Sequence, residues 1–402
     1  MSSANNGTAD LFSLRRRLRE VGGLFFKIGL IGFGGPAVTI AMMEDEVVNR
    51  RQWISRQDFL DLLGFTNLIP GPNAAEIAIH VGLLRAGWPG FWLSGAGFIV
   101  PAAATTMALA WAYARWGALP QVAPFLYGIK PAMLAVVASA LWRLAHSAVK
   151  GRRLAIIGAV VLAASLLGVN EILLLLLGGV LGMLWLRSDD VARWLSRRPG
   201  AGAVAPLGWA LWEMAGWGAE RVGEIAHPSL WDLFWFFFLR VGAVLYGSGY
   251  VLVAFLQGGL VRDLHWLSQP VLLDAIAAGQ FTPGPLLSTA TFIGYLLRGV
   301  PGAVLATVAV FLPSFIFVAA LHGVVPRLRL SPWTAALMDA VNVCSLGLMA
   351  AVAIKIGAAT LLDWRAVLIA LAAAVLAVRW RANSAALVLG GAAAGWLLSL
   401  VH

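Results

Sequence analysis

The sequence predicts an all-α polytopic membrane protein made of two homologous halves, arranged as an inverted repeat, with a Pro-Gly-Pro-broken helix in each half. Of the 402 residues, 60% are hydrophobic and 12% are charged, whereas a soluble domain carries about 25% charged residues. Several apolar runs approach the ~20 residues that span a bilayer. The triplet at 70–72 recurs at 283–285, inside a second apolar segment.

An internal repeat covers most of the chain. An offset of 213 residues aligns 25–85 with 238–298 without a gap, and an offset of 212 continues the alignment beyond them. The pairs in register include Lys27–Arg240, Gly29–Gly242, Asp61–Asp274, Arg85–Arg298 and Pro101–Pro313. Chance does not place so many glycines, prolines and charges in register, so the protein is a duplicated module.

The repeat divides the chain into four parts: an N-terminal tail (1–20), a first membrane repeat (21–186), a linker (187–228) and a second membrane repeat (229–402). The tail is polar and ends in a run of arginines, which predicts a cytoplasmic N-terminus. The linker carries Trp and Glu in a pattern typical of an interfacial amphipathic helix.

Each repeat is expected to begin with a glycine-rich helix, at about 22–43 and 230–256. The broken segments follow at about 58–86 and 271–299, and each is taken to cross the membrane once. Inverting the second half then brings five arginines to the cytoplasmic side, as the positive-inside rule requires. They are Arg262, Arg327, Arg329, Arg379 and Arg381. Six crossings in the first half would not invert the second, so one more or one fewer is needed before residue 229.

The Pro-Gly-Pro triplets predict two half-helices meeting at a break. Proline supplies no N–H and crowds the preceding turn, and glycine permits any dihedral angle. Pro72 and Pro285 suit the first position of the following helix, whose unpaired N–H groups and positive dipole end then face the break. Paired breaks of this kind suit an anion transporter, although each could be a structural kink. The candidate residues here are Pro70, Gly71, Pro72, Asn73, Thr282, Pro283, Gly284, Pro285 and Thr289.

Lys27 and Arg240 are candidate substrate-binding cations, because they occupy equivalent places inside the first helix of each half. An intramembrane cation usually faces a cavity or a partner; the alternative is snorkelling to the interface. Gly34 and Gly35, loosely matched by Gly247, would let the backbone approach a ligand or let helices pack closely.

Glu76 and His80 are four residues apart on the helix after the first break, so they share a face. They could relay a proton, contribute to the substrate site, or form a buried hydrogen-bonded pair. No His-Glu-x-x-His motif, nucleotide fingerprint or nucleophile–His–acid set occurs, and Cys344 is alone. We therefore expect no metal, no cofactor and no catalytic residues, and the net charge of +10 is attributed to cytoplasmic loops and lipid surfaces, not to nucleic acid. A membrane-embedded enzyme is the alternative class.

The chain resembles the chromate ion transporter family in its long form with two homologous halves. The first half carries Phe33-Gly34-Gly35-Pro36, Trp53-Ile54-Ser55 and Leu68-Ile69-Pro70-Gly71-Pro72-Asn73. The second carries Gly279-Gln280-Phe281-Thr282-Pro283-Gly284-Pro285 and Ala290-Thr291-Phe292-Ile293-Gly294-Tyr295.

The resemblance implies a secondary transporter that exports chromate across the bacterial inner membrane and confers chromate resistance. Sulfate or another oxyanion is the alternative cargo. The expected partners are the oxyanion, the lipid bilayer and, as an assembly, a homodimer.

Overall fold

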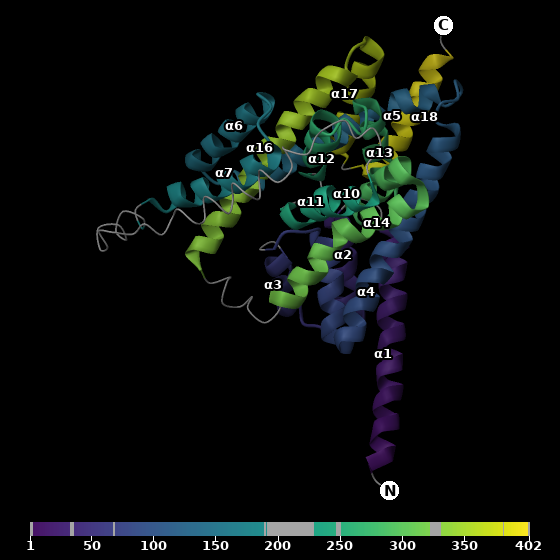
Figure 1. Cartoon of the computed structure of the whole chain (residues 1–402), viewed down its shortest axis with the longest axis vertical. Helices are drawn as coiled ribbons and strands as arrows, with labels where there is room; N and C mark the ends of the chain where they lie inside the picture. Colours follow the sequence, from purple (N-terminus) through teal and green to yellow (C-terminus); the bar gives the residue numbers. More distant parts are fainter. Residues whose placement is uncertain are drawn as a thin grey trace.

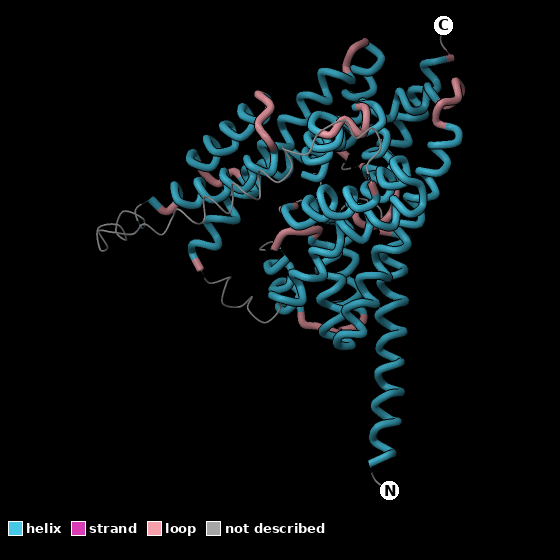
Figure 2. The backbone as a smooth tube through the Cα atoms, in the orientation of Figure 1, coloured by secondary structure: helices cyan, strands magenta, loops and turns pink. Residues whose placement is uncertain are grey.

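The computed structural model of the chain contains helices and no strands in the part that it describes (Figure 2). That part comprises residues 3–32, 36–66, 69–188, 190, 229–246, 251–321, 331–380 and 382–400. Gly34, Gly35, Gly247 and the interfacial helix predicted for the linker lie outside the described residues.

The helices follow the duplicated order expected from the sequence (Figure 1). The first repeat contains α1 (Ser3–Ile31), α2 (Pro36–Glu44), η1 (Asp45–Arg50), α3 (Arg56–Thr66), α4 (Asn73–Trp116), α5 (Ala123–Ala148), α6 (Arg152–Leu166) and α7 (Glu171–Leu186). The second contains α10 (Leu230–Asp232), η2 (Leu233–Phe238), α11 (Leu239–Val244), α12 (Val251–Leu256), η3 (Gln257–Asp263), α13 (Gln269–Phe281), η4 (Leu286–Ser288), α14 (Thr289–Leu321), α16 (Pro332–Thr360), α17 (Trp364–Arg379) and α18 (Ser384–Ser399).

Four of the described helical segments are long and apolar enough to cross a membrane. They are Asn73–Trp116, Ala123–His146, Leu286–Leu321 and Pro332–Thr360. Together with the shorter apolar helices Glu171–Leu186 and Ser384–Ser399, they make this a multi-pass membrane protein.

The first glycine-rich segment is a hairpin, so the expectation of one continuous helix over 22–43 is wrong. Lys27 Nζ on α1 lies 3.5 Å from Glu46 Oε1 on η1, whereas 19 residues of continuous helix would separate them by about 28 Å. The glycine-rich run after α1 ends that helix, and Pro36 starts α2 in the position that proline favours. The segment expected at 230–256 is broken likewise, because α11 ends at Val244 and α12 begins at Val251.

The Pro-Gly-Pro segment of the first repeat is a second hairpin. α3 ends at Thr66 and α4 begins at Asn73. The rings of Phe65 and His80 meet edge to face at 4.6 Å. Further out, the Arg85 guanidinium lies 5.1 Å from the Trp53 ring. The arm after the break therefore returns to the start of α3 instead of continuing away from it.

α4 itself reverses direction directly after this arm. Ala86 (φ −140°, ψ 18°) and Gly87 (φ 64°, ψ −155°) are not helical, and a Cβ on Gly82 would lie 2.3 Å from the Gly90 carbonyl oxygen. Residues 88–116 thus run antiparallel to the arm before them. Arg298 (φ −145°, ψ 24°) and Gly299 (φ 61°, ψ −151°) make the same turn in α14.

These turns locate the change of offset between the repeats more accurately than the sequence alignment. Ala86 is the structural equivalent of Arg298, so the offset is already 212 there, and the alignment of Arg85 with Arg298 is wrong by one residue. The second repeat compensates with the 3₁₀ turn η4. Three residues of 3₁₀ helix rise about 6 Å, as do four α-helical residues.

Two equivalent loops join the hairpins, one in each repeat. Gln52 and His265 mark them, and both have the same positive φ of 52°. Arg153 at the start of α6 donates to the carbonyl oxygen of Trp185 at the end of α7, so α7 begins at the far end of this pair. There Glu171 binds Arg262, with N–O distances of 2.8 and 3.0 Å.

We name the two ends the N face and the far face. The N face carries Trp53, Arg85 and Lys150, the last of which binds Asp339 at the start of α16. The far face carries Glu171, Arg262 and the loop before α17, where Tyr127 of α5 donates to Asp363. The sequence argument that grouped Arg262 with the cytoplasmic arginines is therefore wrong, because it counted the first hairpin as a crossing helix.

The two repeats intertwine instead of lying side by side as separate bundles. α16 of the second repeat packs between α6 and α7 of the first, and α18 packs on α5 (Figure 1). A Cβ on Gly128 would lie 2.0 Å from the carbonyl oxygen of Gly391, so only glycine permits this helix approach. This exchange brings the breaks of one repeat against helices of the other.

Candidate functional site

Two equivalent hydrogen bonds tie each Pro-Gly-Pro break to the opposite repeat. The Gly71 amide donates to the Leu245 carbonyl oxygen at 2.6 Å, and the Gly284 amide donates to the Gly32 carbonyl oxygen at 3.1 Å. Gly284 is 213 residues after Gly71, and Leu245 is 213 after Gly32, so each bond is the counterpart of the other. Each Pro-Gly-Pro break is thus held by the end of the first helix of the opposite repeat.

The prolines shape these breaks slightly differently from the sequence prediction. Pro72 (φ −80°, ψ 103°) and Pro285 (φ −74°, ψ 135°) stand one residue before their helices, in extended conformation. Neither occupies the first helical position. Pro70 and Pro283 precede the glycines, and Asn73 opens α4.

The first break is lined by a buried acid. Glu76 lies in the first turn of α4 and is 0% exposed. A Cβ on Gly71, which has φ +148°, would lie 2.0 Å from Glu76 Oε1 and 2.6 Å from the Ser314 hydroxyl of α14. No residue in the described part of the chain forms a hydrogen bond of standard geometry with either Glu76 oxygen. Tyr246, which follows α11, lies close enough to interact electrostatically with the carboxylate.

The second break is lined by hydroxyls and an amide. Thr282 and Ser288 are buried, with their hydroxyl oxygens 3.4 Å apart, and Thr289 donates to the Leu286 carbonyl oxygen at 2.8 Å. Gln280 is 6% exposed, and among the described residues its Nε2 has no hydrogen-bond partner. Gly284 has φ +93°, and its Cβ would lie 2.6 Å from Ala102 Cβ. Ala102 corresponds to Ser314 at an offset of 212.

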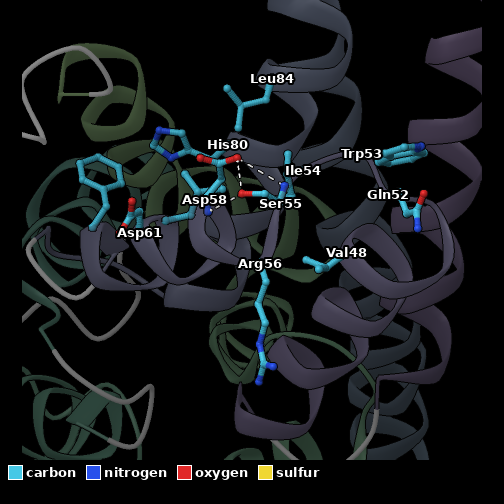
Figure 3. Close-up of a pocket in the computed structure, with 12 residues that line it drawn as sticks. Val48, Gln52, Trp53, Ile54, Ser55, Arg56, Asp58, Asp61, His80 and Leu84 are labelled. Carbon is cyan, nitrogen blue, oxygen red and sulfur yellow. Dashed lines mark hydrogen bonds between the residues drawn. The ribbon is translucent and has the colours of Figure 1, made fainter.

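A pocket of about 940 Å³ opens beside the first break. It lies between the loop at 52–55, α3 and the arm of α4 that follows the break, and His80 and Leu84 line it. Figure 3 shows Asp58 and Ser55 among the lining residues, and the Ser55 hydroxyl donates to Asp58 at 2.6 Å. The pocket is open on the N face, and His80 is only 4% exposed.

The corresponding region of the second repeat contains a charge cluster. Asp274, the equivalent of Asp61, accepts a hydrogen bond from Tyr113 at 2.8 Å and lies 3.7 Å from Lys130 Nζ. Asp274 thus forms an ion pair with Lys130. Asp61 instead lines the N-face pocket and accepts from Gln57 at 3.2 Å. The pocket next to Asp274 is smaller, about 370 Å³, and mostly apolar side chains line it.

Lys27 and Arg240 each lie beside an acid of their own repeat. The side chain of Lys27 is 56% exposed and pairs with Glu46, which also binds Arg51 at 3.1 Å. Partial burial opposes ionisation of Glu46, but the Arg51 hydrogen bond and the Lys27 charge hold its pKa below the ordinary value. Arg240 is half-buried, and Asp263 is the acid whose negative charge acts on its guanidinium.

Sequence reasoning did not single out three polar side chains at the breaks. They are Tyr246, Gln280 and Ser314. Two of them could have been found by comparing the halves, because Tyr246 stands where the first repeat has Phe33 and Ser314 stands where it has Ala102. In each pair, the residue of the second repeat is polar and the equivalent residue of the first repeat is apolar. No cluster of three His, Cys, Asp or Glu suited to a metal occurs among the described residues.

Comparison with known protein families identifies the family to which this chain belongs. A family model described as chromate transporter matches the chain twice, over residues 19–183 and 231–396. The chain belongs to the chromate transporter family. The chromate transport protein of Cupriavidus metallidurans is 31% identical over 96% of this chain and 93% of the relative.

Two other relatives match over similar lengths. The chromate transport protein of Pseudomonas aeruginosa is 30% identical over 99% of this chain and 96% of the relative. The probable chromate transport protein of Synechococcus elongatus is 29% identical over 89% of both chains. No solved structure is significantly similar to this chain. The resemblance to the chromate transporter family that the sequence motifs indicated is confirmed.

Proposed function

We propose that this protein exports chromate from the cell across the inner membrane, and that the dianion binds where the Pro-Gly-Pro breaks of the two repeats meet. The observation that carries the proposal is the pair of reciprocal hydrogen bonds, Gly71 to Leu245 and Gly284 to Gly32. They bring the N-terminal ends of two half-helices to the interface between the repeats. Unpaired N–H groups at such ends favour anions.

The topology that supports this function is an inverted repeat with two re-entrant hairpins in each half. In the first half α1–α2 and α3 with the arm 73–85 enter from the N face and return to it. Residues 88–116, α5, α6 and α7 then cross, which is an even number of crossings. The second half enters from the far face, beside Glu171. Four crossings are still an even number, so this topology requires the chain to change sides of the membrane between residues 190 and 229.

Charge assigns the N face to the cytoplasm. Loop and helix-end cations at this face are numerous: Arg50, Arg51, Arg85, Lys150, Arg152, Arg153, Arg187 and Arg379. The far face carries fewer, chiefly Arg115, Arg262 and Arg365. The positive-inside rule then places the N-terminus in the cytoplasm, and irregular backbone at the breaks is buried against protein, as the bilayer requires.

The site must replace the hydration of a tetrahedral dianion. Donors are available from the helix ends after Pro72 and Pro285 and from Ser288 and Gln280, whereas Thr282 and Thr289 would have to turn their hydroxyls away from the carbonyl oxygens of Gly279 and Leu286. Lys27 and Arg240 supply two positive charges, one in each repeat. Gly34, Gly35 and Gly247, which lie outside the described residues, remain candidates for backbone contact with the anion. Glu76 and His80 line the first break and its pocket, where only an uncharged carboxyl suits an anion.

The membrane potential gives the direction of transport. Moving a dianion outward from a negative interior gains about 4.6 kcal/mol per 100 mV, from about 2.3 per charge. Export is therefore downhill without a coupling ion, whereas import would need one.

Flux through purified protein in liposomes tests the proposal. With an inside-negative potential imposed, labelled chromate should leave the liposomes faster than it leaves protein-free liposomes. Sulfate and molybdate are tested in parallel. Sulfate flux without chromate flux would replace chromate by another oxyanion. No flux of any oxyanion by folded protein would contradict the transport proposal.

A further inference from the structure

Glu76 is an acid in a place where an anion transporter would not be expected to keep one. It is 0% exposed and lies directly beneath the first break, with its Oε1 within 2.0 Å of where a Gly71 Cβ would stand. In the described part of the chain, neither of its oxygens has a hydrogen bond of standard geometry, and the Ser314 hydroxyl is the polar donor beside the carboxyl. Burial without a compensating cation among the described residues makes the charge state of this carboxyl sensitive to any further charge placed beside it.

We propose that Glu76 is a proton-binding site coupled to the oxyanion site, so that the carboxyl takes up a proton when the anion binds and releases it when the anion leaves. This inference rests on the proposed function, since it assumes an oxyanion at the breaks. A carboxylate and a dianion in one low-dielectric site repel each other strongly. Protonation of Glu76 removes this repulsion, and by linkage each binding event favours the other to the same extent.

The second repeat shows what the same place looks like without a proton site. At the equivalent position, the offset of 212 to 213 gives Ser288 and Thr289, both buried. Hydroxyls can donate to an anion at any pH near neutrality, so this break needs no proton to accept one. Ser314 and Tyr246, the polar neighbours of Glu76, both belong to the second repeat. The residues at the equivalent positions of the first repeat are Ala102 and Phe33, which are apolar. The repeats have thus diverged into a titratable break and a neutral one.

A route for the proton leads from the N face. His80 is one helical turn from Glu76 on the same face of α4, and it lines the pocket of about 940 Å³. Asp58 lines the same pocket (Figure 3). The titratable or charged groups around the path are Tyr246 at the carboxyl, then His80, and then Arg56, Asp58 and Asp61 in the pocket. His80 can pass protons between that pocket and the carboxyl.

The coupling remains compatible with export. A chromate dianion that leaves together with one proton still carries one net negative charge outward, which an inside-negative potential favours. Coupling therefore makes transport sensitive to the pH gradient without reversing its direction in a polarised cell.

The test uses purified full-length protein in liposomes, with the membrane potential clamped to zero by potassium and valinomycin. With acid outside, wild-type protein should accumulate labelled chromate at least threefold above its level without a pH gradient. Glu76→Gln should lose this accumulation but retain chromate–chromate exchange within about threefold of wild type, because glutamine mimics the protonated carboxyl. Glu44→Gln, which neutralises an acid that pairs with Arg56 at the N face, should behave like wild type.

Each outcome separates the coupling from the transport function. Chromate itself takes up a proton in the neutral range, but that effect would drive both variants equally and so cancels in the comparison. Wild-type exchange that ignores the pH gradient would overturn the coupling and leave transport standing. Accumulation by Glu76→Gln equal to wild type would overturn it too, as would loss of exchange in a well-folded Glu76→Gln protein, which would make Glu76 part of the binding site or the architecture. Absence of chromate movement in wild type would instead remove the proposed function.

Discussion

The two Pro-Gly-Pro breaks have nearly the same backbone but different side chains. Both central glycines have positive φ, +148° at Gly71 and +93° at Gly284, and both donate to the opposite repeat. Around Gly71 lie Glu76 and Ser314, and around Gly284 lie Ala102 and the hydroxyls of the second repeat. Duplication preserved the architecture that orders the breaks, whereas the chemistry inside each break was free to differ. Side-chain divergence in a symmetric frame is how such a protein can give its two halves different tasks.

Replacing the central glycines should have the largest effect. Gly71→Ala and Gly284→Ala are each expected to abolish chromate flux in liposomes, because a Cβ at either place meets neighbours at 2.0 and 2.6 Å. The positive φ adds strain of about 1–3 kcal/mol. Leucine at either position should fail as well, since it needs still more space.

Gly299→Ala is the matched control, because Gly299 has φ +61° but nothing within 4 Å of its Cβ. It carries the backbone strain without the clash, so it should retain most of its flux. If Gly299→Ala fails as completely as Gly284→Ala, then strain alone accounts for the loss and the close packing of the breaks is not the cause. Protein amount in the membrane must be equal in all variants.

Removing the two equivalent cations should have a smaller and unequal effect. Arg240→Gln is expected to lower chromate flux by about tenfold or more, because a half-buried charge is weakly screened. Lys27→Gln should lower it less, since Lys27 is exposed and Glu46 already binds Arg51. Lys27→Arg should retain more activity than Lys27→Gln, because it keeps the charge.

Initial rates of labelled chromate uptake at several salt concentrations would measure this difference. Normal flux in both glutamine variants at wild-type expression would assign the two cations to interface anchoring. The anion site would then consist of the helix ends and the hydroxyls of Thr282, Ser288 and Thr289.

The sequence was sufficient for the repeat, the helical class and the position of the Pro-Gly-Pro segments, because those depend on residue type and spacing. It could not show that the glycine-rich helix folds back on itself, since a hairpin and a crossing helix have the same composition. The contact of Lys27 with Glu46 reveals that fold, and it depends on tertiary packing. Ser314 was missed for the same reason, because it lies more than 200 residues from the Gly71 that it touches.

The paired breaks can work as proposed only if the repeats enter the membrane from opposite sides. Single cysteines at Gln52 and His265, in a Cys344→Ser background, test this with a membrane-impermeant thiol reagent applied to intact cells. Both positions are exposed and carry the same backbone conformation, so their intrinsic reactivities are comparable. We expect His265→Cys to be labelled from outside and Gln52→Cys only after the membrane is permeabilised. Labelling of both cysteines from the outside, or of neither, would contradict the inverted arrangement.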